Sequence, residues 1–188
     1  LEMASLGAKV LQTRSVELAM IHRVPVQVLS SFEDLPGTLV CDEDEIVEQQ
    51  LVSGIAYSRD EAKITLVKVP DKPGVAAAIF GPLADGGINV DMIVQNTSED
   101  GATTDMTFTV QASELPRTLD VLKTAKADIG YFDVKSSADV VKVSVIGIGM
   151  RSHAGVAAMM FKALSEKGIN ILAISTSEIK ISVLIDAA

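Results

Sequence analysis

KITLVKVPDKPGVAAAIFGPLADGGINV, residues 63–90, returns later in the chain as KVSVIGIGMRSHAGVAAMMFKALSEKGINI, residues 142–171. In each copy an apolar run precedes a glycine loop, a helix-like segment and a Gly-Ile-Asn sequence. The offset between the copies is 81 positions from Gly74 to Gly155, and it is the same from Asn89 to Asn170. A repeat of this length indicates two copies of one structural unit.

The first copy and the residues after it predict the element order βαββαβ. Apolar, β-branched runs predict strands at 64–69, 88–95, 103–110 and 131–135. Helices are expected after Gly74 and over 114–126, and Gly81-Pro82 predicts a kink or an early end of the first helix between Ala78 and Pro82. This order folds as an antiparallel sheet with both helices on one face, the ferredoxin-like α+β class.

The second copy is shorter by one strand. It predicts strands at 141–148, 169–176 and 179–185 and a helix over 155–167, after which the sequence ends. Because a sheet without its last strand leaves backbone groups unpaired, a strand at 46–56 completes it, the chain is cut short, or both apply. We assign 63–138 to the first unit, and 46–62 together with 139–188 to the second.

The N-terminal region, residues 1–45, has a different pattern. It predicts a helix over 5–21 with an irregularity near Gln12-Thr13, and a short strand over 24–29. Residues 30–44 are polar, contain Pro36-Gly37 and end in an acidic cluster. That composition is typical of a linker.

Charge and cysteine content exclude several classes of protein. The formal net charge is −9 and no segment concentrates lysine and arginine, so we expect no nucleic-acid partner and no membrane partner. The single cysteine, Cys41, cannot form an intrachain disulfide. Since we see neither a secretory signal pattern nor an apolar run of bilayer length, we predict a cytoplasmic protein.

The most distinctive chemistry is the loop Asp71-Lys72-Pro73-Gly74, between a predicted strand and a predicted helix. Pro73 suits the first helical turn, and Gly74 lets a ligand approach the backbone. Free N–H groups at the positive end of the helix dipole favour a carboxylate. Asp71 either caps the helix or meets a ligand ammonium group. The loop is therefore a candidate clamp for an α-amino acid.

Polar side chains elsewhere in the two copies extend this candidate site. Asn89 and Asn170 follow Gly-Ile, and each either contacts a ligand or caps a turn. Gln95-Asn96-Thr97 and residues 175–178 end the corresponding strands, as part of a ligand site or of a solvated turn. His153 has no Cys, Asp or Glu at ligand spacing, so we expect no metal site.

Three motifs carry a resemblance to a known family. They are the Asp-Lys-Pro-Gly loop with Gly-Ile-Asn-Val-Asp-Met-Ile at 87–93, Asp-Gly-Ala-Thr-Thr-Asp at 100–105, and Ile-Ser-Thr-Ser-Glu-Ile-Lys-Ile-Ser-Val at 174–183. Together they resemble the paired ACT domains of aspartate kinase. The N-terminal region, with Val24-Pro-Val and Pro36-Gly37-Thr38, resembles the end of that family's kinase domain. Residues 1–45 are therefore interpreted as a kinase-domain stub and linker, and the resemblance covers essentially the whole chain.

The resemblance implies a regulatory function. Aspartate kinases phosphorylate aspartate with ATP, and their ACT pairs sense the end products of the pathway. The glycine-rich nucleotide segment and catalytic lysine of the family are missing from this sequence, so we expect no catalytic residue, no cofactor in this stretch and no activity of the stretch alone. ATP and Mg²⁺ are expected only with the missing kinase domain. The piece is either a separate regulatory subunit that accompanies catalytic chains or a truncated enzyme.

The implied ligand is threonine, lysine or both, bound between the ACT domains of a homodimer for allosteric feedback inhibition. Carried over to the first copy, the implied contacts are Asp71, Lys72, Pro73, Gly74, Val75, Asn89, Val90, Asp91 and Gln95. From the second copy they are Ser152, His153, Ala154, Gly155, Val156, Asn170, Ile171, Thr176, Ser177 and Glu178. The second loop lacks the aspartate and lysine of the first, so one occupied groove per interface is an open alternative.

Other classes remain as rivals. An ACT regulator of a different enzyme shares the same pattern. A small enzyme on this fold would use His153 or Cys41, although neither has an evident partner. An RNA-binding module of the same strand order would need exposed aromatics and a basic face, whereas this chain has no Trp, two Tyr and an acidic balance.

Overall fold

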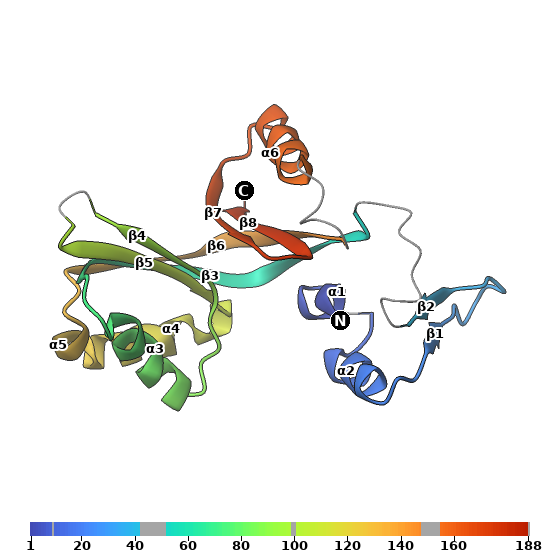
Figure 1. The fold of residues 1–188 in the computed structure, drawn as a ribbon, viewed down its shortest axis with the longest axis horizontal. Helices are drawn as coiled ribbons and strands as arrows, with labels where there is room; N and C mark the ends of the chain where they lie inside the picture. The colour runs from blue at the N-terminus through green and yellow to red at the C-terminus, as the bar shows by residue number, and fades with distance from the viewer. Residues whose placement is uncertain (9, 42–51, 99–100, 148–154, 188) are drawn as a thin grey trace.

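The computed structural model describes residues 1–8, 10–41, 52–98, 101–147 and 155–187. Figure 1 shows their arrangement. The elements are α1 Glu2–Ser5, α2 Thr13–Ile21, β1 Val26–Val28, β2 Thr38–Val40, β3 Gly54–Pro70, α3 Val75–Asp85, β4 Asp91–Thr97, β5 Thr103–Val110, η2 Ala112–Glu114, α4 Leu115–Thr124, α5 Lys126–Ile129, β6 Asp133–Ile146, α6 Val156–Glu166, β7 Ile171–Thr176 and β8 Lys180–Asp186.

A single antiparallel sheet of six strands, in the order β4-β5-β3-β6-β8-β7, runs through the whole repeat region. Its two central strands, β3 and β6, are long enough to serve both copies. We call β4, β5, residues 62–70 and residues 133–137 with α3, α4 and α5 the first lobe. Residues 54–58 and 140–146 with β7, β8 and α6 form the second lobe. The fold is therefore α+β with two ferredoxin-like units, as predicted.

The strand pairing shows where the second lobe obtains its missing strand. Residues 54–58 of β3 pair with residues 142–146 of β6, whereas residues 63–67 pair with residues 133–137. The register shifts between Ser58 and Lys63, at the passage from one lobe to the other. The early part of the strand predicted at 46–56 lies outside the described residues, and the assigned boundaries of the two units stay a prediction.

Two of the predicted element ends are wrong, for physical reasons. The strands predicted at 131–135 and 141–148 are parts of one strand, β6, because Ser-Ser-Ala-Asp at 136–139 contains no Gly or Pro to turn the chain. Helix α3 does not end before Pro82 but continues to Asp85. Proline removes one helical hydrogen bond, but Ile79 and Leu83 on either side of it are buried and keep the helix against the sheet.

The other helices and the N-terminal region differ in detail. The helix predicted over 114–126 is divided into η2, α4 and α5, and the one predicted over 5–21 into α1 and α2. Strand β1 pairs with β2, a strand inside the predicted linker that the sequence analysis missed. The N-terminal region contacts the second lobe through an apolar cluster of Leu6, Ala56 and Ile146.

The main core lies in the first lobe. There the inner faces of β3 and β5 pack against α3, α4 and α5, and Phe80 meets Phe108 edge to face at 5.3 Å. The second lobe has a smaller core in which Val156 of α6 packs on Val145 and Ile181. Figure 1 shows α6 on the opposite side of the long sheet from α3, α4 and α5. The helices of each lobe therefore lie on one face of its sheet, and on the second lobe the residue that ends α1, Leu6, packs on the opposite face.

Candidate functional site: the glycine loop, the start of β4 and a buried lysine

The loop that precedes α3 has the geometry expected of an anion-binding helix start. Gly74 is the N-cap residue with φ +93°, and no side chain caps the helix, so the interpretation of Asp71 as a helix cap is wrong. A Cβ added at Gly74 would meet no atom within 4 Å. Residues 71–74, which we call the Gly74 loop, are exposed, whereas Val75 is buried beneath them. The Val75 N–H donates to the Lys72 carbonyl at 3.2 Å, whereas Ala76 and Ala77 that follow it in the first turn are exposed, so the helix start is accessible to a carboxylate.

The structure does not bring this loop together with the start of β4 within one chain. Pro70, just before the loop, lies level with Thr103 of β5, whereas Asp91 lies level with Thr109. Six strand residues correspond to about 20 Å. Gln95 lies between these ends, opposite Met106, and is exposed. A ligand that contacts the loop and residues 89–91 together would need a second chain.

Residues 89–92 form the irregular start of β4, and we call them the β4 corner. Asn89 is exposed, Val90 is half-buried, and the ladder between β4 and β5 is irregular between Asp91 and Val94. Met92 has φ +47°, a left-handed conformation that is costly for a residue with a side chain. Its side chain is buried in a cluster with Val140, Leu184, Leu172 and Ala173. The first lobe thus packs on the second through this corner.

A buried ion cluster lies beside the β4 corner. The Lys142 ammonium on β6 is 2.6 Å from Glu61 Oε1 and 2.9 Å from Asp91 Oδ2. The Lys142 and Glu61 side chains are each 8% exposed and the Asp91 side chain is 50% exposed. Asp91 Oδ1 accepts the backbone N–H of Met92 at 2.8 Å. We call Glu61, Asp91 and Lys142 the Lys142 cluster.

The ion pair between Asp91 and Lys142 shifts the pKa of both groups. Burial alone would raise the pKa of Asp91, but the hydrogen bond and positive charge of Lys142 outweigh it and hold that pKa below its usual value. Burial likewise disfavours charged Lys142, yet its hydrogen bonds to Glu61 and Asp91 raise its pKa above the usual value. Both groups are therefore charged at neutral pH.

A cavity of about 270 Å³ opens at the Lys142 cluster, between the N-terminal segment and the sheet. Its lining includes Asn89, Val90 and Asp91 from the predicted site, together with Ser5 and Thr109. The hydroxyl of Thr109 is buried and has no hydrogen-bond partner among the described residues. The cavity therefore offers polar groups of both charges to a small molecule.

The sequence analysis missed Glu61, Thr109 and Lys142. A lysine inside the apolar run Val140-Val-Lys-Val was the available signal, because an inward-facing charge needs a partner. The sequence contains no indication of which carboxylate that partner is.

The second copy presents a less complete site. Ser152, His153 and Ala154 lie outside the described residues. Gly155 repeats the positive φ of Gly74, at +128°, and a Cβ added there would also meet no atom within 4 Å. Val156 is buried below it, as Val75 is in the first copy.

The remaining predicted contacts of the second copy lie at the two ends of β7. Asn170 and Ile171 precede or begin the strand, and Thr176 ends it. Ser177 and Glu178 are exposed in the turn to β8, where the Ser177 N–H donates to the Lys180 carbonyl at 2.9 Å. Turn formation therefore uses part of this polar segment, and one chain does not assemble the two ends into one site.

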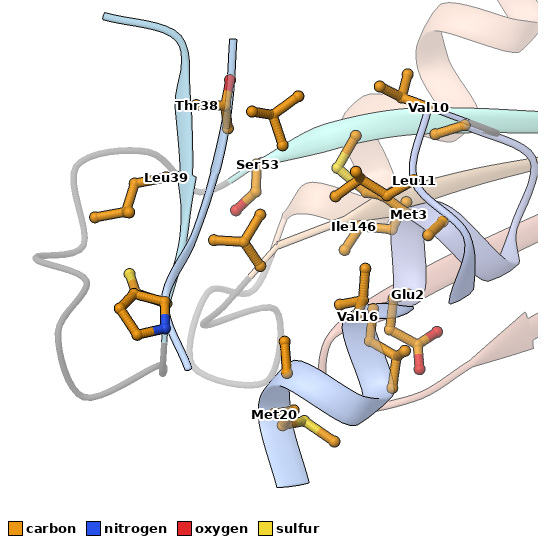
Figure 2. Close-up of a pocket in the computed structure, with 18 of the residues that line it drawn as sticks. Glu2, Met3, Val10, Leu11, Val16, Met20, Thr38, Leu39, Ser53 and Ile146 are labelled. Atoms are coloured by element: carbon orange, nitrogen blue, oxygen red, sulfur yellow. The ribbon is translucent and has the colours of Figure 1, made fainter. Parts of the chain in front are cut away.

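Another cavity, of about 700 Å³, lies between the N-terminal region and the second lobe and is lined mainly by apolar side chains. Figure 2 shows side chains of α1, α2, β2 and β6 around it, with Met3, Met20, Leu39 and Ile146 among those labelled. Cys41, a free and half-buried thiol, also lines it. Within the part of the chain that the structure describes, no group of three His, Cys, Asp or Glu side chains is placed to hold a metal ion. None of its described helices is both long enough and apolar enough to cross a membrane.

Comparison with known protein families matches both copies to the ACT domain, over residues 63–127 in the first and 143–188 in the second. An aspartokinase of Pseudomonas aeruginosa is 54% identical over 99% of this chain, and the chain spans 45% of that relative's length. The crystal structure of the ligand-free regulatory subunit of Thermus thermophilus aspartate kinase is 40% identical, with a TM-score of 0.69, covering 73% of this chain and 90% of the subunit.

Two solved states of one enzyme add a comparison of shape. Aspartokinase III of Escherichia coli matches 99% of this chain and 41% of its own in both states. The TM-score is 0.78 for the R-state with aspartate and ADP, at 28% identity, and 0.69 for the T-state with lysine and aspartate, at 29% identity. Because the repeat, the sheet and the relatives agree, the chain belongs to the aspartokinase family, as the regulatory part built from two ACT domains.

Proposed function

We propose that this chain binds an end-product amino acid, lysine or threonine, and thereby inhibits an attached or associated aspartate kinase. The observation that carries the proposal is the exposed Gly74 loop at the start of α3, where no side chain caps the helix and a Cβ added at Gly74 would meet no atom within 4 Å. An α-carboxylate fits such a helix start, and Asp71, which does not cap the helix, is available for an α-ammonium group.

A second chain completes this site in the proposal. The Gly74 loop and the β4 corner lie at opposite ends of the first lobe, so a two-fold dimer is required for both to contact one ligand. Residues 89–91 then come from one protomer and the loop from its partner. Ligand binding links the protomers and selects one arrangement of the pair.

The allosteric step follows from that selection. An effector shifts the enzyme only if it binds one arrangement more tightly than the other, and coupling of about 1 to 3 kcal/mol is typical. The solved E. coli relative has lysine in its T-state. The TM-score of this chain is 0.78 with the R-state of that relative and 0.69 with its T-state.

The catalytic activity belongs to the rest of such an enzyme. In the proposal, ATP and Mg²⁺ bind the kinase portion, and the N-terminal region of this chain is the end of that portion. A regulatory subunit associated with separate catalytic chains is the alternative arrangement, and the solved regulatory subunit of the Thermus enzyme is a precedent in a relative.

Calorimetric titration of the chain with lysine and with threonine tests the proposal. We expect saturable heat with at least one of them and none with an uncharged sugar of similar size. The absence of heat from both amino acids at millimolar concentration would contradict it. Sedimentation velocity of the same samples reports whether the binding species is a dimer.

A further inference from the structure

We propose that Lys142 is a positioning residue of the effector site: it fixes the β4 corner of the first lobe onto β6 of the second lobe through Asp91. The inference rests on the proposed amino-acid site. It adds a residue that the family motifs do not contain, and it assigns to the second lobe the control of a ligand contact in the first.

The charge balance of the cluster shows what Lys142 does. Glu61 is buried, lies 2.6 Å from the ammonium and is sufficient to neutralise it. Asp91 is half-exposed and lies at 2.9 Å, so it has access to water without Lys142. The contact between Lys142 and Asp91 is therefore not required to compensate either charge, and its effect is to hold Asp91 in place.

Asp91 in turn holds the strained part of the corner. Its second carboxylate oxygen accepts the N–H of Met92, the residue with φ +47°. A left-handed conformation at a methionine persists only where surrounding contacts determine it. Lys142 binds one carboxylate oxygen of Asp91, and the other oxygen accepts the N–H of Met92. These two contacts connect the backbone conformation of Met92 to Lys142.

The second lobe contributes the remaining contacts. Alternation along β6 places Val140 on the same face as Lys142, and Val140 packs with Leu184 around the buried Met92 side chain. One face of the second lobe thus holds Asp91 by charge and Met92 by apolar packing. A change in the position of β6 moves residues 89–91, which are the predicted ligand contacts.

The test uses variants that avoid an unpaired buried charge. Replacement of Lys142→Met together with Glu61→Gln removes both charges, whereas Glu61→Gln alone keeps the contact between Lys142 and Asp91. Calorimetric affinity for lysine and threonine is measured for each on the 188-residue chain. We expect the double variant to bind at least about tenfold more weakly and the single variant within about threefold of the parent chain.

Asp91→Asn separates positioning from direct contact. If Lys142 acts through Asp91, the double replacement in an Asp91→Asn background costs less than about twofold in addition. A full additional tenfold loss there would show that Lys142 touches the ligand itself and would overturn the positioning role. Lys142→Arg, which keeps the charge, is expected to retain most of the affinity.

Amide exchange provides a readout without ligand. Asp91→Asn leaves Lys142 paired with Glu61, so the chain is expected to fold, and exchange over residues 89–94 should accelerate at least about tenfold. Unchanged exchange in this variant would overturn the inference, even if the double variant failed to fold. Normal ligand affinity of a folded double variant would overturn it while leaving the proposed function intact. No binding by the parent chain would refute both.

Discussion

The Lys142 ammonium of β6 lies 2.9 Å from the Asp91 carboxylate of β4, and this contact joins β4 of the first lobe to the second-lobe part of the shared strand β6. Asp91 belongs to the segment that the family resemblance assigns to effector binding. Lys142 belongs to the strand that passes through both lobes. Asp91, a predicted ligand contact in the first lobe, is therefore bound by a residue of the second lobe.

Because of this contact, the free energy of unfolding should fall both at low pH and at high pH. The pKa of Asp91 is lowered in the folded chain, so its stabilisation is complete above its unfolded value of about 3.9 and is lost as the pH falls through the folded value. The pKa of Lys142 is raised, so its stabilisation is complete below about 10.4 and is lost as the pH rises through the folded value. Thermal unfolding at a series of pH values measures the loss of stability in acid and in base. In Asp91→Asn the loss in acid should become smaller. An unchanged loss in acid would contradict the assignment.

Removal of Lys142 alone should destabilise the chain severely. Lys142→Met leaves Glu61 buried without its partner, and uncompensated buried charges typically cost about 3 to 5 kcal/mol. The combined Lys142→Met and Glu61→Gln variant should recover most of that loss, because no charge then remains buried. Urea unfolding of the two variants gives the comparison. Equal stability of the two would show that Glu61 finds water or another partner.

Thr109→Val should not destabilise the chain, and we expect a gain of up to about 1 kcal/mol. The buried Thr109 hydroxyl has no hydrogen-bond partner among the described residues, so the replacement removes an uncompensated polar group. Thr104→Val is the matched control on the same strand, since Thr104 is also buried but donates to the Asn96 carbonyl at 2.9 Å. The control should lose about 1 kcal/mol in urea unfolding. A comparable loss at Thr109 would indicate that a bound molecule satisfies its hydroxyl.

Gly74→Ala should weaken effector binding more than it weakens the fold. The residue has φ +93°, so alanine costs about 1 kcal/mol in backbone strain, but its Cβ meets no atom of the chain itself. The added methyl group instead occupies the approach to the helix start. Gly81→Ala in the same helix is the control, where alanine should stabilise α3 by up to about 1 kcal/mol and leave binding unchanged. Normal affinity of Gly74→Ala would place the ligand elsewhere.

Most of the fold was predicted from the internal repeat of the sequence. Gly74 and Gly155 mark helix starts in both copies, and the apolar runs around them locate the strands. Strand continuity was harder to predict, because the charged segment Arg59-Asp-Glu resembles a turn, although β3 passes through it with only a shift of register. The continuity of β3 is determined by its pairing with β5 and β6, which are distant in sequence, so the local sequence pattern does not predict it.

Only the local part of the candidate site could be predicted from the sequence. The Gly74 loop is local, and its conformation follows from proline and glycine at fixed positions. The Lys142 cluster depends on three strands that meet only in the folded sheet, so neither Glu61 nor the role of Asp91 in the corner was evident from spacing. That the loop and the corner lie at opposite ends of the first lobe is likewise a property of register.

The central claim is that one ligand contacts the Gly74 loop of one protomer and the β4 corner of its partner. Gly74→Ala and Asp91→Asn should each weaken calorimetric binding by at least about tenfold when tested alone.

Mixing the two variants and allowing protomers to exchange tests the claim most directly. Half of the dimers are then mixed, and each mixed dimer has one intact site, so binding should return at about a quarter of the parent stoichiometry with parental affinity. If the mixture binds no better than the separate variants although exchange is complete, the two-chain site is contradicted.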